Sequence, residues 1–521
     1  MEKSRSFDYS GMWSSYIDTS DSEKRFLSME RDDLLKICDE VDVSSFREVS
    51  RLKSKFAGGI PVSYRDGKLY TLRTGPHSRI CGESGSKKSR TVMRGSIISA
   101  ALNRDSIVVT DPKGELFSDP KIRWLLNATG HRVHVIDFRR FDKDGFNPLS
   151  FAFELYVNCA ASRAISLIDN FVAMLITANA GAADPFWNSQ AGDLIRSALQ
   201  LLLFVLSGMK DGHKYFNLLS LRRFISQDQD AMRSFADDLM RCKLPEEMSA
   251  ALKLYRDILY NPEKTYACIV SSANALLSAL CSSSDLLTML SRQSVNVREM
   301  YAEPTALFLV IPDEVKTYDV VTGYMIDTIY HILIDEYTQN YQNKLFEPDC
   351  GIHMLCDEVA SVFISDLSSK VSASRSRLID WVLVYQSEKQ LAAAYSKDYG
   401  TICGNCKNYL FLGSSDHDIL ADVSSQTGSS VTASGRAVPL VTVDDLRAMK
   451  KTREYKDALI RTDNYILCAR LPDYDTFPFL KADPDAVAWK APAKQEEILE
   501  YTPQMLLEHY QSKSRRFLCA N

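Results

Sequence analysis

The predicted fold depends on one octapeptide, Gly82-Glu83-Ser84-Gly85-Ser86-Lys87-Lys88-Ser89. A short apolar strand pattern, Ser78 to Cys81, precedes it, and a helical pattern follows it through Ala101. Backbone N–H groups at a helix start bind phosphate, while a lysine reaches the outer phosphates and a hydroxyl binds Mg²⁺. The octapeptide therefore predicts a nucleotide-binding loop.

The octapeptide departs from the usual phosphate-loop pattern at one position. Gly82, Lys88 and Ser89 fit G-x-x-x-x-G-K-[S/T], whereas Lys87 stands where the pattern has glycine. A left-handed backbone costs a non-glycine residue about 1–2 kcal/mol, so we expect Lys87→Gly to tighten nucleotide binding about tenfold. A basic surface loop, or a shifted loop in which Lys87 itself binds phosphate, are the alternatives. The candidate nucleotide-binding residues are Gly82, Gly85, Ser86, Lys87, Lys88 and Ser89.

A second candidate segment follows the apolar run Ile352 to Cys356, which ends in Asp357-Glu358. An aspartate at the end of a parallel strand can hold Mg²⁺, and a neighbouring glutamate can orient the attacking water. We therefore expect Ser89 and Asp357 to be metal ligands and Glu358 to be catalytic. The alternative is a helix start, where acidic residues are favourable.

A third apolar run, Trp381 to Tyr385, ends in Gln386. Ligands bind at this edge of open α/β sheets, so Gln386 is predicted to sense the γ-phosphate or the lytic water. Upstream, Arg375 and Arg377 lie in a serine-rich stretch and are candidate arginine fingers for a neighbouring subunit's nucleotide. The alternatives are a core-edge glutamine and two solvated arginines.

The remaining pattern indicates an α/β protein with a helical insertion. The strand candidates are mostly continuous apolar runs, which favours a parallel sheet covered on both faces. They are Ser78 to Cys81, Ser106 to Thr110, Val133 to Asp137, Ala306 to Ile311, Ile352 to Cys356, Trp381 to Tyr385, Tyr409 to Leu412 and Tyr465 to Ala469. Asp66-Gly67 predicts a hairpin between residues 61 and 72.

Helical periodicity replaces the strand signal between residues 160 and 298. The predicted helices are Ala164 to Thr177, Trp187 to Leu206, Asp230 to Arg241, Glu246 to Tyr260 and Tyr266 to Ala279. We therefore expect five segments. They are a polar helical segment at 1–56, a nucleotide-binding domain in two parts at 57–159 and 299–485, an inserted all-α domain at 160–298, and a tail at 486–521 with an amphipathic stretch and a basic trio.

Composition excludes several classes of protein. The 521 residues carry a net charge of -5, which excludes a globally basic nucleic-acid coat and makes any DNA contact local. The 12 cysteines are scattered, as expected in a reducing cytosol, and we assign no metal to Cys403 and Cys406. Neither Met1 to Ser20 nor the longest apolar run, Ala198 to Leu206, fits a signal peptide or a transmembrane helix.

Taken in order, these segments resemble the type IV coupling proteins of the TraG/TraD family of conjugative ATPases over roughly residues 58–484. Beyond the nucleotide motifs, the likeness rests on short matches spread along the chain. They are Asp111-Pro112-Lys113-Gly114-Glu115-Leu116, Asn147-Pro148-Leu149, Asp184-Pro185-Phe186-Trp187, Pro304 to Pro312, Gln386-Ser387 with Gln390-Leu391, and Gly404-Asn405-Cys406 through Phe411-Leu412-Gly413.

The resemblance implies a RecA-like domain that uses ATP and Mg²⁺, an all-α domain that receives substrate, and homo-hexamers that move DNA. The implied partners are single- or double-stranded DNA, a relaxase or other secreted protein, and membrane-anchored components of the secretion channel. The family's usual N-terminal anchor is not found, so we expect a cytoplasmic protein held at the inner face of the membrane by a partner, or else a truncated or soluble variant. The alternatives are a non-hydrolysing substrate receptor of the same fold, and a defence or phage-packaging ATPase.

Overall fold

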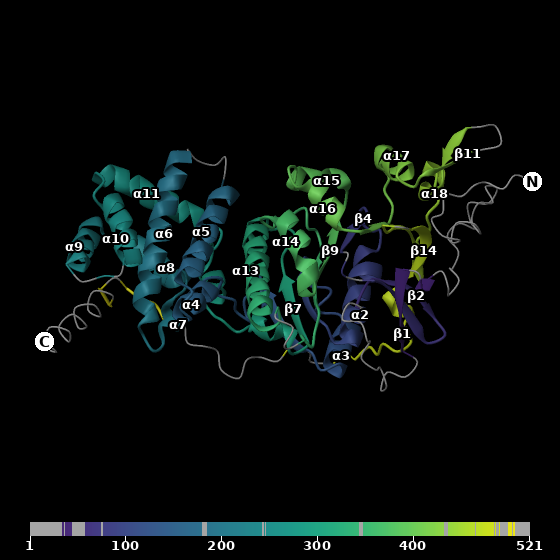
Figure 1. Cartoon of the computed structure of the whole chain (residues 1–521), viewed down its shortest axis with the longest axis horizontal. Coiled ribbons are helices and arrows are strands. Elements are labelled where there is room, and N and C mark those ends of the chain that lie inside the picture. Colours follow the sequence, from purple (N-terminus) through teal and green to yellow (C-terminus); the bar gives the residue numbers. More distant parts are fainter. Residues whose placement is uncertain are drawn as a thin grey trace, which may run out of the picture. The chain divides into compact units, whose positions relative to one another are not determined.

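Contacts divide the chain of this computed structural model into two units (Figure 1). The first comprises Met1–Val135, Val297–Glu314 and Leu333–Lys490, and the second comprises Ile136–Asn296, Val315–Ile332 and Ala491–Asn521. The structure describes residues 34–35, 37–43, 58–73, 75, 77–179, 185–241, 244, 246–342, 347–431, 436–463, 465–483, 485, 489, 499–502 and 504–505.

A nine-stranded sheet forms the centre of the first unit, in the order β14-β13-β10-β4-β9-β8-β5-β7-β6. Neighbouring strands from β10 to β7 are parallel, while β13 and β14 run antiparallel at one side. The strands are β4 (Ser78–Cys81), β5 (Ser106–Asp111), β6 (Arg132–Asp137), β7 (Thr305–Val310), β8 (Ile352–Cys356), β9 (Ile379–Tyr385), β10 (Asn408–Phe411), β13 (Tyr455–Arg461) and β14 (Ile466–Pro472).

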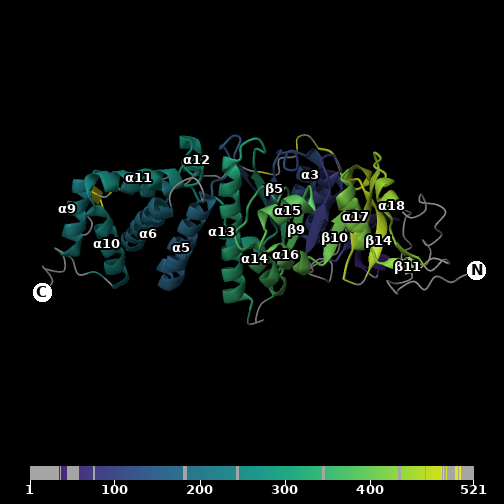
Figure 2. The ribbon, with the colours of Figure 1, turned by 90° about the horizontal axis from the view of Figure 1, so that it is seen from above.

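Helices cover both faces of this sheet. Every residue of β5, β7, β8 and β9 is buried, which explains why these strands read as continuous apolar runs. Right-handed crossovers place α2 and α3 on one face and α14 to α16 on the other, because the chain crosses the sheet in one direction from β4 to β6 and in the opposite direction from β7 to β10. Figure 2 shows α3 on one side of the strands and α14 and α16 on the other. The helices of this unit are α2 (Arg94–Asn103), α3 (Pro120–Ala128), α14 (Leu367–Ser374), α15 (Glu388–Ala394), α16 (Tyr399–Asn405), α17 (His417–Ser425) and α18 (Val443–Arg447).

Two small sheets complete the first unit. β2 (Pro61–Arg65) and β3 (Lys68–Leu72) form the predicted hairpin, and β1 (Cys38–Asp42) pairs with β3. Asp66 and Gly67 both have positive φ, as a two-residue turn of type I′ requires. The other small sheet pairs β11 (Ser429–Val431) with β12 (Ala437–Pro439).

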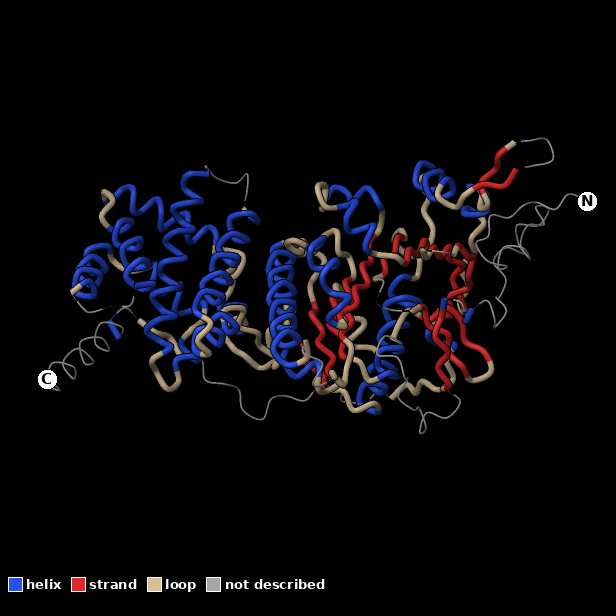
Figure 3. The backbone as a smooth tube through the Cα atoms, in the orientation of Figure 1, coloured by secondary structure: helices blue, strands red, loops and turns tan. Residues whose placement is uncertain are grey.

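The second unit is built from helices, drawn in blue in Figure 3. Gly192 on α6 allows close packing against α5, because a Cβ there would lie 2.7 Å from Cδ1 of Ile176. The helices are α4 (Ser150–Val157), α5 (Ala161–Ala178), α6 (Pro185–Ser207), α7 (Gly212–Tyr215), α8 (Leu218–Ile225), α9 (Gln229–Met240), α10 (Glu246–Leu259), α11 (Glu263–Leu276) and α12 (Ser284–Met289). The first part of α13 (Thr317–Asn340) also belongs to this unit.

The predicted α/β fold with a helical region is confirmed, and all eight strand candidates correspond to strands. β13 was not predicted, and β1 lies in the segment expected to be helical. When residues are grouped by their contacts, the helical unit begins at Ile136, whereas the sequence placed its start at residue 160. The unit also includes residues 315–332. The amphipathic stretch and basic trio expected in the tail fall almost wholly outside the described residues. Across the part of the chain that the structure describes, no helix has both the length and the apolar character needed to cross a bilayer.

Candidate functional site

The phosphate-loop segment lies directly after β4, which is flanked by the parallel strands β10 and β9. A helix follows it at once, with a π-helical first turn, Lys88–Met93, that continues into α2. π-helical turns are rare in proteins, and those that occur often lie at functional sites. The loop therefore occupies the position between a strand end and a helix start where backbone N–H groups can bind an anion.

Gly82 and Gly85 meet two different backbone requirements of this loop. A Cβ at Gly82 would lie 2.6 Å from Oγ of Ser86 and 3.0 Å from Cβ of Leu412, so no side chain fits there. Gly85 has φ +76°, a left-handed conformation that favours glycine. The Ser86 hydroxyl is buried and has no hydrogen-bond partner in the structure, so the loop holds an unsatisfied polar group.

Lys88 points back into the loop. Its Nζ donates to the carbonyl oxygen of Gly82 at 2.6 Å and to that of Glu83 at 3.3 Å, and the residue is only 8% exposed. These bonds hold the ammonium group among the backbone atoms of the loop, where a buried charge needs partners. Ser89, the next residue, is partly buried in the first helical turn.

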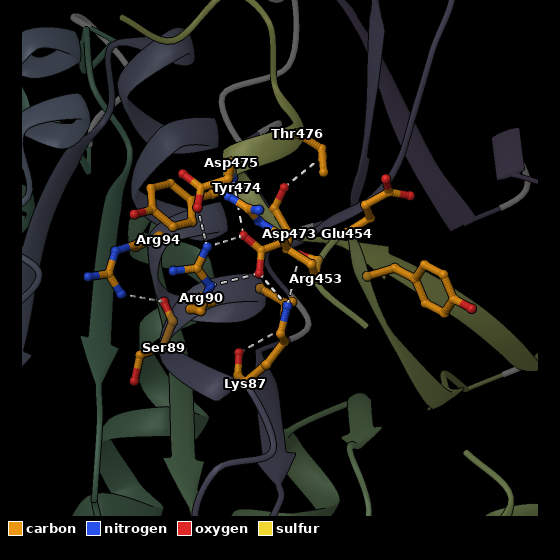
Figure 4. Close-up of polar contacts among 12 residues, drawn as sticks. Lys87, Ser89, Arg90, Arg94, Arg453, Glu454, Asp473, Tyr474, Asp475 and Thr476 are labelled. Atoms are coloured by element: carbon orange, nitrogen blue, oxygen red, sulfur yellow. Dashed lines mark hydrogen bonds and ion pairs between the residues drawn. The ribbon is translucent and has the colours of Figure 1, made fainter. Parts of the chain in front are cut away.

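Lys87 points in another direction (Figure 4). The residue has φ 68° and ψ 20°, so it adopts the left-handed conformation that the pattern's glycine would adopt freely. Its Nζ lies 2.6 Å from Oδ2 of Asp473 and 3.1 Å from the carbonyl oxygen of Arg453. The Lys87 side chain is therefore bound by the segment that follows β14.

Asp357 and Glu358 follow β8, two strands from the loop. Burial raises the pKa of Asp357 to about 7, with a further rise from Glu358 and an opposing effect of Lys88. Glu358 has φ 53°, and its Oε1 accepts a hydrogen bond from Nε2 of Gln386 at 3.0 Å. The strained backbone and this bond together fix the direction of the Glu358 carboxylate.

These residues lie at one edge of the sheet because their strands are parallel neighbours. β4 pairs with β9 and β9 pairs with β8, so the loop, Gln386 and Asp357-Glu358 all follow carboxyl ends that point the same way. Lys88 and Asp357 are close enough for the lysine to lower the pKa of the carboxyl. The structure thus brings together four of the predicted site positions: the loop, Asp357, Glu358 and Gln386.

The two candidate arginine fingers lie at the opposite edge. Arg375 and Arg377 form a short turn immediately before β9, whereas Gln386 immediately follows it. The seven residues of β9 separate the two positions by about 20 Å. Arg375 is exposed, and Nη1 of Arg377 donates to the carbonyl oxygen of Ala373 at 2.6 Å. These arginines are therefore not part of the loop site of their own chain.

Asp111 has a structural role that the sequence did not reveal. Its Oδ2 accepts hydrogen bonds from the backbone N–H groups of Leu116 and Phe117, at 3.0 and 2.9 Å. Burial raises the pKa of Asp111 to about 6, although these two N–H groups oppose the rise. Asp111 therefore holds the turn after β5 in place, beside Asp357, whose pKa it helps to raise.

A cavity of about 460 Å³ adjoins the loop on its other side. It is lined by Glu83 to Ser86, by residues 412–415 after β10, and by Lys451 and Lys456. Nζ of Lys451 donates to the carbonyl oxygen of Gly85 at 2.9 Å, and burial lowers the pKa of Lys456. Sequence reasoning missed these lysines because they lie more than 360 residues from the loop.

Comparisons with known proteins agree with this arrangement. The family model described as Type IV secretory system Conjugative DNA transfer matches residues 33–463. The plasmid coupling protein TrwB in complex with the ATP analogue ADPNP is similar in structure, with a TM-score of 0.56 and 15% identity over 86% of this chain and 97% of that chain. TrwB in complex with ADP and Mg²⁺ gives a TM-score of 0.55, also at 15% identity, over 86% of this chain and 98% of that chain. No curated protein matches the sequence.

Proposed function

This chain belongs to the Type IV secretory system conjugative DNA transfer family, and on that basis we propose that its 82–89 loop binds ATP with Mg²⁺ and hydrolyses ATP to drive DNA transfer. The structures of TrwB, whose fold this chain shares, were solved with ADPNP and with ADP and Mg²⁺. ATP and Mg²⁺ are accordingly the ligands proposed for this loop.

One observation carries the proposal: a buried lysine, two carboxylates and a glutamine from different strands lie at the same sheet edge. Lys88 would bind the outer phosphates, since its ammonium group already lies among the loop carbonyls. Glu358, fixed by Gln386, would orient the lytic water. The groups that we propose for hydrolysis all lie at this edge of the sheet. An arginine of a second subunit would add one further positive charge.

The donor set fits Mg²⁺ held together with a nucleotide. Among the described residues, no group of three or more His, Cys, Asp or Glu side chains is placed to hold a metal ion unaided. Mg²⁺ in nucleotide sites commonly takes one or two protein ligands and completes its shell with phosphate oxygens and water. Ser89 and Asp357 are the proposed protein ligands, and the unsatisfied hydroxyl of Ser86 is a further group available to a phosphate.

The proposed setting follows from the family. DNA, single- or double-stranded, is the proposed substrate, delivered with a relaxase or other secreted protein to membrane-anchored channel components. Homo-hexamers are the proposed active form, because Arg375 and Arg377 lie outside their own chain's site and would act on a neighbour's nucleotide. A partner protein would hold the hexamer at the inner face of the membrane.

The test is ATP turnover by the full chain with and without single-stranded DNA. The expected result is Mg²⁺-dependent phosphate release that DNA stimulates and that Lys88→Ala abolishes, because the outer phosphates lose their fixed charge. Lys264→Ala, which alters an exposed lysine of α11, is the control and should leave turnover unchanged. Tight ATP binding without turnover in the presence of DNA would favour the non-hydrolysing receptor, and no binding at all would refute the proposed site.

A further inference from the structure

Lys87 and Lys88 are consecutive, yet their side chains diverge. Lys88 turns into the loop, whereas Lys87 turns outward to Asp473. The Asp473 side chain has no exposed area and that of Lys87 is 13% exposed, so the pair at 2.6 Å is shielded from solvent. Salt screens shielded pairs much less than surface pairs, and removing one partner of a buried pair leaves an uncompensated charge. Lys87 thus has a fixed partner outside the loop.

Asp473 is itself held by several groups (Figure 4). Arg90 binds both of its oxygens, with Nε 2.8 Å from Oδ2 and Nη2 2.7 Å from Oδ1. The backbone N–H of Asp473 donates to the carbonyl oxygen of Glu454 at 2.7 Å. Burial opposes the negative charge, but the bonds from Arg90 and Lys87 outweigh it and lower the pKa of Asp473. Asp473 is therefore a charged, fixed anchor.

The segment that carries this anchor is attached to the helices beside the loop. The guanidinium groups of Arg90 and Arg94 lie 4.9 and 5.0 Å from the centre of the Tyr474 ring, as cation–π contacts. The Tyr474 hydroxyl donates to Oδ2 of Asp119, the N-cap of α3, at 2.8 Å. Residues 473–474 are therefore a rigid support for the start of the helix that follows the loop.

The backbone of Lys87 links this anchor to the phosphate side. Its carbonyl oxygen accepts hydrogen bonds from the N–H of Arg90 at 3.0 Å and of Thr91 at 2.9 Å, so Lys87 defines where the helix begins. Its left-handed conformation turns the chain from the loop into that helix. If Lys87 returned to the conformation that its Cβ prefers, the N–H groups of the loop and of the first helical turn would lose their common direction.

We propose that Asp473 is a positioning residue for the nucleotide-binding loop: it pairs with Lys87, holds that residue left-handed and outside the phosphate site, and so allows a lysine where the loop pattern has glycine. The inference rests on the proposed nucleotide binding at residues 82–89. It also changes the expected effect of Lys87→Gly, because the wild-type loop is already held in the binding conformation and the substitution should leave affinity within about threefold of the wild type.

The test compares the affinity of the full chain for ADPNP with Mg²⁺, by titration calorimetry, in a set of Lys87 variants. Lys87→Met keeps the backbone strain and loses the anchor, so affinity should fall about tenfold, the equivalent of one strained residue. Lys87→Arg keeps a charge that can reach Asp473 and should bind as the wild type does. If Lys87→Met binds like the wild type, the proposal is wrong.

A double-substitution cycle then separates positioning from a merely structural role. Asp473→Asn should weaken binding about tenfold in the Lys87 chain and by less than about threefold in the Lys87→Gly chain, because glycine needs no anchor. Asp475→Asn is the matched control. Asp475 lies on the same segment as Asp473 and binds Arg90 and Lys121, but it does not bind Lys87. Equal weakening by Asp473→Asn in both backgrounds would overturn the proposal.

Amide hydrogen exchange of residues 82–91 distinguishes a failure of this inference from a failure of the proposed function. Asp473→Asn should accelerate exchange in this segment of the Lys87 chain and leave it unchanged in the Lys87→Gly chain, with no nucleotide present. If the wild type does not bind ADPNP, the proposed function fails, and the exchange comparison still decides the role of Asp473. Unchanged exchange in both chains would refute the anchor.

Discussion

The side-chain amide of Gln386 donates to the carboxylate of Glu358 at 3.0 Å and joins the ends of two neighbouring parallel strands. Gln386 follows β9 and Glu358 follows β8, so the bond depends on the register of the two strands. A glutamate held in this way cannot rotate freely, and its backbone is already in a left-handed conformation. Gln386 therefore holds the Glu358 carboxylate in one orientation, as a group that accepts a proton requires.

This pair leads to a prediction about hydrolysis. Glu358→Gln keeps the shape of the side chain and removes its charge, so nucleotide affinity should stay within about threefold while kcat falls by about 100-fold or more. Gln386→Ala should lower kcat less, because the carboxylate remains but is no longer held. Single-turnover kinetics measure both variants. A Glu358→Gln enzyme with wild-type kcat would remove Glu358 from the catalytic site.

The two glycines Gly82 and Gly400 should respond to alanine in opposite ways. Gly82→Ala places a Cβ 2.6 Å from Oγ of Ser86 and 3.0 Å from Leu412, so the loop must shift, and stability should fall by about 1–3 kcal/mol with nucleotide binding weakened. Gly400 lies in α16 with nothing within 4 Å of the added Cβ, so Gly400→Ala should stabilise the chain by about 0.5–1 kcal/mol. Urea denaturation measures both, and a stabilised Gly82→Ala variant would contradict the observed loop.

A buried ion-pair cluster at the amino-terminal edge of the strands should make stability depend on pH. Burial opposes a charge on His353, but Asp105 at 3.0 Å and Asp380 at 3.8 Å outweigh it and raise its pKa from 6.5 to about 9, while His77 also contacts Asp380. A raised histidine pKa contributes stability that is full below pH 6.5 and is lost as the pH rises through 9. Urea unfolding at pH 6 to 9.5 should show this loss.

His353→Gln is the control for that pH dependence. The variant should be less stable than the wild type at pH 6, because it leaves Asp105 and Asp380 without the shared cation. Its stability should fall less than that of the wild type as the pH rises from 6.5 to 9. Parallel pH profiles for the two proteins would show that His353 is not the titrating group.

The arginines at the amino-terminal side of β9 allow a test of the assembled form. Arg375→Ala should leave nucleotide affinity of the single chain unchanged and reduce turnover only in the oligomer, because Arg375 lies at the sheet edge opposite its own loop. Mixing Arg375→Ala chains with Lys88→Ala chains should restore part of the activity, since a wild-type arginine can then face an intact loop. Without such restoration when the two variants are mixed, the proposal that Arg375 acts between subunits fails.

The sequence alone predicted most of the elements of the sheet and of the helical region, and it named the candidate site residues that the structure brings together. The octapeptide at 82–89, the apolar runs ending in Asp357-Glu358 and Gln386, and the helical periodicity between 160 and 298 are local patterns, and the structure contains the elements they predict. Such signals are local because burial on both faces makes a strand continuously apolar, and phosphate binding needs adjacent residues at a helix start. β13 was not predicted because its sequence, YKDALIR, mixes charged and apolar residues.

Only the tertiary structure decided where the Lys87 side chain points and which residue it binds. Its departure from the pattern was visible in the sequence, and the strain of a left-handed lysine could be estimated from it. Its partner, Asp473, lies 386 residues away after β14, and no local signal marks that aspartate as the anchor of a loop. A pairing of this kind depends on strand order and on the path of the chain around the sheet, which residue spacing does not encode.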